Sequence, residues 1–143
     1  MGLFDFASNI GRKLFGNDDD DAAAKIAAHL EANNPGVDGL SVAFQDGVVT
    51  LSGNGSDSAA VEKAILMAGN VEGVKEVVNN TSVTVEEGQV EYYEIQSGDT
   101  LSKLAKKYYG DPMVYDRIFE ANREVIQDPD LIFVGQKIRI PLG

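Results

Sequence analysis

The chain has 143 residues and a formal net charge of −11, with 23 acidic and 12 basic side chains. This acidic excess argues against nucleic acid as a partner, because phosphate binding requires a basic face. There is no cysteine and His29 is the only histidine, which excludes disulfides, thiolate nucleophiles and metal sites built from several Cys or His ligands.

Residues 3–15 are predicted to form an amphipathic helix. Its apolar positions follow helical spacing and are Leu3, Phe6, Ala7, Ile10 and Leu14. The segment does not fit a secretion signal, because its basic residues follow the apolar ones, and no apolar run approaches the roughly 18 residues of a membrane span. Two cations beside four aspartates make a poor membrane-surface helix. We therefore expect this helix to dock on the protein's own core, in a cytoplasmic protein without membrane contact.

Residues 22–85 show the pattern of an α-β-β-α-β domain. The predicted elements are a helix at 22–33, strands at 40–45 and 48–52, a helix at 56–70 and a strand at 74–85. Asp46 and Gly47 give a strong hairpin signal between the first two strands. Gly69 and Asn70 are typical of the end of a helix.

Residues 92–141 follow the order β-α-α-β. The predicted elements are a strand at 92–96, helices at 100–110 and 112–122, and a strand at 136–141. A polar linker at 86–91 is too short to hold two domains far apart. We expect an α+β monomer of two small domains in contact. The expected boundaries are 1–85 for the first domain with its N-terminal helix, 86–91 for the linker and 92–143 for the second domain.

Both segments resemble known domain families. Residues 92–141 are similar to a LysM domain through the motifs SGDTL at 97–101, IFEAN at 118–122 and VGQKIRIP at 134–141. Residues 46–83 resemble a BON domain through Gly47, Val49, Leu51 and Gly53, and through VEGV at 71–74. With MGLFDF at the start, this order resembles a family of small bacterial potassium-binding proteins over nearly the whole chain. The resemblance implies a cytoplasmic protein that binds K⁺ selectively and changes shape on binding.

A potassium site of this kind is expected to consist of backbone carbonyls. Carbonyls replace the hydration shell of K⁺, whereas cages rich in carboxylates favour Ca²⁺ or Mg²⁺. The last turn of a helix leaves about four carbonyls without intrahelical partners. Such an end lies in AILMAGNVEGV at 64–74, where Gly69 and Gly73 allow the chain to curl back. From the residues alone, a helix cap followed by a turn is the simpler interpretation.

The family resemblance favours the ion site over that simpler interpretation. It implies a K⁺ site formed by the main-chain oxygens of Ala7, Ile10, Gly69, Val71 and Val74. The N-terminal helix would then close over the ion. The run of four aspartates at 18–21 is a departure from the family, and we expect it to leave a buried site unchanged.

The LysM resemblance implies an alternative ligand, an N-acetylglucosamine or peptidoglycan chain. The family's groove corresponds to Gly98, Asp99, Thr100, Leu101, Ile132 and Phe133. The simpler interpretation is that Asp99 and Thr100 cap a helix while Ile132 and Phe133 fill a core. Phospholipid binding through the BON segment is disfavoured by the acidic charge. Catalysis is disfavoured because the serines have no plausible histidine partner, so we expect a binding protein and not an enzyme.

Overall fold

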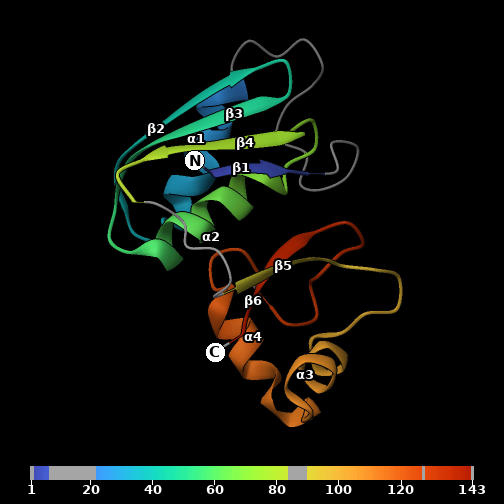
Figure 1. Ribbon diagram of the computed structural model, residues 1–143. Helices are drawn as coiled ribbons and strands as arrows, with labels where there is room; N and C mark the ends of the chain where they lie inside the picture. The colour runs from blue at the N-terminus through green and yellow to red at the C-terminus, as the bar shows by residue number, and fades with distance from the viewer. Residues whose placement is uncertain (1, 7–21, 84–89, 127, 143) are drawn as a thin grey trace.

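The computed structural model describes residues 2–6, 22–83, 90–126 and 128–142, which form two α+β units. Helix α2 (Ser58–Gly69) lies between the sheet of the first unit and the second unit (Figure 1). The mixed α+β class and the two-unit organisation expected from the sequence are confirmed. Within the described ranges, each helix is too short or too polar to cross a membrane.

The first unit is a four-stranded sheet with helices packed on one face. Besides α2, its elements are β1 (Gly2–Asp5), α1 (Ala22–Ala32), β2 (Val37–Gln45), β3 (Val48–Gly55) and β4 (Glu76–Thr81). The strand order is β1-β4-β3-β2, with β3 and β4 parallel and the other pairs antiparallel. A parallel pair needs a crossover connection, and α2 supplies it.

The predicted helix at 3–15 is wrong at its start. Gly2–Asp5 form β1, which pairs with β4 so that Leu3 lies opposite Val78 and Phe4 opposite Val77. This strand pairs backbone groups of β4 that would otherwise form an open sheet edge. A distant pairing therefore overrides the local helical spacing. Residues 7–15 of the predicted helix lie outside the described residues.

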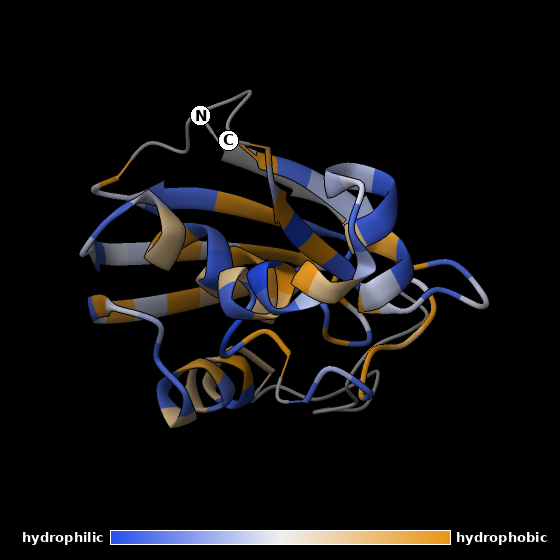
Figure 2. Ribbon diagram, turned by 90° about the horizontal axis from the view of Figure 1, so that it is seen from below, coloured by the Kyte–Doolittle hydropathy of each residue, from blue (hydrophilic) through white to orange (hydrophobic). Residues whose placement is uncertain are grey.

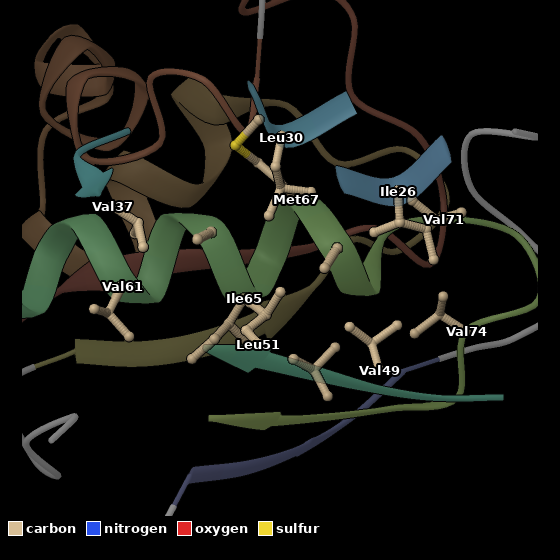
Figure 3. Close-up of a cluster of buried hydrophobic side chains, with 13 residues drawn as sticks. Ile26, Leu30, Val37, Val49, Leu51, Val61, Ile65, Met67, Val71 and Val74 are labelled. Carbon is tan, nitrogen blue, oxygen red and sulfur yellow. The ribbon is translucent and has the colours of Figure 1, made fainter. Parts of the chain in front are cut away.

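The core of the first unit lies between α1, α2 and the inner face of the sheet. Ile26 of α1 and Ile65 of α2 are completely buried against Val49 and Leu51 of β3 (Figure 3). Orange and blue segments alternate along the strands in Figure 2, as expected where one strand face meets a core. Val71 and Val74, which follow α2, also belong to this core.

The second unit pairs two strands and packs its helices beside them. Its elements are β5 (Val90–Glu94), α3 (Leu101–Tyr109), the 3-10 helix η1 (Pro112–Val114), α4 (Tyr115–Ala121) and β6 (Lys137–Pro141). The single helix predicted at 112–122 is therefore divided. Asp111 caps η1 by accepting the Met113 N–H at 2.9 Å, and the regular helix starts at Tyr115. Strands β5 and β6 are antiparallel.

Candidate functional site

The chain turns back sharply where helix α2 ends. The Asn70 N–H donates to the Leu66 carbonyl at 2.9 Å, and the Val74 N–H donates to the Val71 carbonyl at 3.1 Å. Gly73 has φ 101°, a conformation that favours glycine. The buried side chains of Val71 and Val74 fix this turn on the core. The carbonyls of Gly69, Val71 and Val74 therefore belong to one short turn at the negative end of the α2 dipole.

Phe6 brings the N-terminal segment to the end of α2. Its N–H donates to the Lys75 carbonyl at 2.8 Å, and its ring lies against Gly69. A Cβ atom at position 69 would lie only 2.0 Å from the ring Cζ atom of Phe6. Glycine at this position is thus required by close packing. The other two predicted ligands, Ala7 and Ile10, lie outside the described residues.

The turn after α2 presents main-chain carbonyls at the end of a helix. The described part of the chain holds no group of three or more His, Cys, Asp or Glu side chains suited to a metal ion. The turn offers main-chain carbonyls at a helix C-terminus, where the dipole favours positive charge, and its sequence also includes Glu72. Carbonyl donors suit K⁺, whereas Ca²⁺ and Mg²⁺ sites use carboxylates.

The same turn contacts the second unit through Asn70. Its side-chain amide donates to the Lys137 carbonyl at 2.8 Å, and its amide oxygen accepts the Lys137 N–H at 2.8 Å. The Lys137 ammonium lies 5.0 Å from the centroid of the Phe6 ring. The N-terminal segment, the end of α2 and the start of β6 therefore meet at one place.

A buried ion pair joins the two units nearer the start of α2, at Glu62. Arg139 Nε donates to Glu62 Oε1 at 2.9 Å, and the side chains of Arg139 and Glu62 are only 9% and 4% exposed. Two further hydrogen bonds complete the cluster, from the Ser58 hydroxyl to Glu62 and from Arg139 to the Ala121 carbonyl. Burial raises the pKa of the Tyr92 hydroxyl, and the nearby Glu62 carboxylate raises it further. Contact between the units was expected from the linker, but these residues were not.

A groove lies in the second unit beside the start of α3. Its volume is about 450 Å³, and its lining residues are Asp99, Thr100, Leu101, Ser102, Tyr115, Pro129, Asp130 and Ile132. Four of the six residues predicted for a glycan groove are therefore brought together. Gly98 and Phe133 are not among the lining residues. Tyr115 and Asp130 were missed because they come from segments outside the motifs that carried the resemblance.

Asp99 presents a fixed negative charge at this groove. Burial acts to raise its pKa, but hydrogen bonds from the Tyr93 hydroxyl at 2.6 Å and the Gln96 N–H at 2.7 Å outweigh that effect. The charges of Lys107 and Lys103 act in the same direction, so the pKa of Asp99 lies below its ordinary value. The hydrogen bond to Asp99, together with burial, raises the pKa of Tyr93 to about 12. Asp99 is therefore ionised at neutral pH and can accept hydrogen bonds.

Comparison with known proteins identifies both units. A BON domain family model matches residues 18–86, and a LysM domain family model matches residues 93–141. The potassium binding protein Kbp of Escherichia coli O6:H1 is 36% identical over 147 residues, which cover 99% of each chain.

Other relatives match a part of the chain. An uncharacterized protein of Deinococcus radiodurans is 53% identical over 49 residues, or 34% of this chain and 19% of its own. An esterase of Mycobacterium tuberculosis is 45% identical over 51 residues, which cover 11% of the esterase. So small a share carries no argument for esterase activity, and the relative that matches throughout is named as a binding protein. The chain therefore belongs to the Kbp family and consists of a BON domain followed by a LysM domain.

Proposed function

We propose that this protein binds K⁺ through main-chain carbonyls at the C-terminal end of α2 and acts as a cytoplasmic, non-enzymatic potassium sensor. The proposed ligands are the carbonyl oxygens of Ala7, Ile10, Gly69, Val71 and Val74. The observation that carries the proposal is the buried turn after α2, against which Phe6 packs. It is supported by similarity, over 99% of both chains, to a protein named for potassium binding.

The arrangement of the domains suggests how binding would change the shape of the protein. An ion held by carbonyls from the N-terminal segment and from the turn after α2 joins two parts of the chain that meet at Phe6. The turn also holds β6 of the LysM domain through Asn70. A ligand that prefers the ordered arrangement shifts the population toward it. K⁺ would therefore select a compact monomer from a looser ensemble.

Thermal unfolding in different salts tests this proposal. At a K⁺ concentration 100-fold above Kd, binding to the folded state alone adds about 2.7 kcal/mol to the free energy of unfolding. We expect the melting temperature to rise and saturate in KCl, but not in NaCl or choline chloride at the same ionic strength. Equal melting temperatures in the three salts would contradict K⁺ binding.

The groove of the LysM domain supports glycan binding as a second candidate function. Its volume of about 450 Å³ and the ionised Asp99 at its edge suit a sugar that offers hydroxyl and amide donors. Titration with N-acetylglucosamine oligomers should give saturable ¹⁵N–¹H shift changes at Asp99, Thr100, Asp130 and Ile132. Unchanged spectra at millimolar oligomer would remove this candidate.

A further inference from the structure

We propose that Asn70 is a positioning residue that couples cation binding at the end of α2 to docking of the LysM domain. This inference rests on the proposed K⁺ binding and adds the residue through which the two events influence each other. It follows from the position of Asn70 between Gly69 and Val71, and from the two hydrogen bonds of its side chain with Lys137.

The contact between Asn70 and Lys137 has the geometry of a strand pairing. Strand β6 pairs with β5 along one edge, and two asparagine side chains pair with the backbone on its other edge. Within the LysM domain, Asn122 donates to the Arg139 carbonyl at 2.7 Å and accepts the Arg139 N–H at 2.8 Å. Asn70 repeats this double contact at Lys137, two residues earlier on the same edge. Asn70 of the BON domain thus pairs with the free edge of β6 as a neighbouring strand would.

The backbone of Asn70 connects this docking contact to the carbonyl turn. Its N–H closes the last turn of α2 on the Leu66 carbonyl. The carbonyls of the residues on either side, Gly69 and Val71, are proposed ligands of the ion. When Lys137 holds the side chain, the backbone between these two carbonyls is held in one orientation. Without Lys137, the Asn70 side chain loses both hydrogen bonds, and the backbone between the Gly69 and Val71 carbonyls is no longer held from the LysM side.

The second docking contact provides a comparison. The ion pair of Glu62 with Arg139 lies about two helical turns before the end of α2 and makes its hydrogen bonds with Ser58 and Ala121. Loss of this pair weakens docking but leaves the double hydrogen bond of Asn70 available whenever the domains meet. The two contacts therefore have different expected effects on the response to K⁺.

The experiment measures K⁺ affinity and domain separation in the full chain. Because the sequence has no cysteine, Ser41→Cys and Lys106→Cys give two unique, exposed labelling sites, one in each domain. Spin labels at these positions report the distance distribution at increasing KCl and constant ionic strength, while calorimetry gives Kd. The test variants are Asn70→Ala and Asn70→Ser, and Asn80→Ala is the matched control because Asn80 is an exposed asparagine on β4.

We expect K⁺ to shorten the distance in the parent chain and in Asn80→Ala. In both Asn70 variants, Kd should rise at least fivefold and the distance should no longer respond to K⁺, since coupling acts reciprocally on the two events. The double variant Glu62→Leu with Arg139→Leu lacks the ion pair without leaving a buried charge unpaired, so its distance should still shorten with K⁺. Amide spectra check that each variant is folded. If Asn70→Ala does not fold, the test is made with Asn70→Ser.

The outcomes separate this inference from the proposed function. A parent chain that binds no K⁺ overturns both. A parent chain that binds K⁺, with Asn70 variants of unchanged Kd and unchanged distance response, overturns the role of Asn70 and leaves K⁺ binding intact. The same holds if the double variant Glu62→Leu with Arg139→Leu loses the response as completely as Asn70→Ala, because the coupling would then not depend specifically on Asn70.

Discussion

Replacing Arg139 with leucine is expected to release the LysM domain from helix α2. The substitution leaves the Glu62 carboxylate, 4% exposed, without its guanidinium partner. Removing one member of a buried ion pair costs about 3–5 kcal/mol, because the remaining charge is not solvated. Undocking returns Glu62 to water and relieves that cost. The measurement is the distance between labels on the two domains, together with the thermal unfolding curve.

Two variants serve as controls for this prediction. The double variant Glu62→Leu with Arg139→Leu should dock again, since well-packed apolar residues often replace a buried pair without loss. Lys63→Ala should destabilise the protein less than Arg139→Leu, because the Lys63–Glu124 pair is more exposed than the Glu62–Arg139 pair. This variant removes the contact between Lys63 Nζ and Glu124 Oε1 at 3.0 Å. The Lys63 side chain is 17% exposed and the Glu124 side chain 30%. If the single variant keeps the parent distance, the ion pair is not needed for docking.

Replacing Gly69 with alanine is expected to displace Phe6 from the end of α2. The added methyl group would lie 2.0 Å from one ring carbon and 2.2 Å from two others, so the ring must leave its position. Overpacking of this kind typically costs about 1–3 kcal/mol. The proposed ligands Ala7 and Ile10 follow Phe6 in the chain, so displacement of Phe6 should also weaken the proposed K⁺ site. Denaturant unfolding should show the loss of stability, and melting in KCl should no longer show stabilisation.

The matched control for this variant removes the clash from the other side. In the double variant Phe6→Ala with Gly69→Ala, the methyl group no longer meets a ring. The double variant should therefore lose less stability than the sum of the losses measured for Phe6→Ala and Gly69→Ala alone. Such non-additivity is expected for residues in direct contact. Unchanged stability and an unchanged K⁺ response in Gly69→Ala alone would show that the packing of Phe6 against Gly69 contributes to neither property.

The elements that depend on local pattern were predictable from the sequence. Helices α1 and α2 lie within the predicted ranges, and the hairpin forms at Asp46 and Gly47, because apolar spacing and turn chemistry act over a few residues. The order of BON and LysM domains followed from motifs spread along the chain, and the family models confirm it.

Features that depend on distant pairing were not predictable in the same way. Strand β1 forms because residues 2–5 find a partner in β4, far along the chain. Glu62 and Asn70 have partners 77 and 67 positions away, and in the sequence they look like a helix surface residue and a helix cap. Nothing local distinguishes a carboxylate that will be buried by a second domain from one that remains in water.

The candidate sites were predictable to different extents. The resemblance to LysM placed Asp99, Thr100, Leu101 and Ile132 at one groove, and the structure brings them together. A carbonyl site carries no side-chain motif, because every residue has a carbonyl and only the backbone path decides which ones converge. The carbonyl ligand set therefore stays a prediction.

Carbonyl ¹³C NMR during a KCl titration tests the central claim most directly. At constant ionic strength, K⁺ should shift the carbonyl resonances of Gly69, Val71 and Val74, and the shifts should saturate. NaCl should leave these resonances in place. Equal shifts in both salts, or K⁺ shifts confined to the LysM groove around Asp99 and Asp130, would contradict a potassium site at the end of α2.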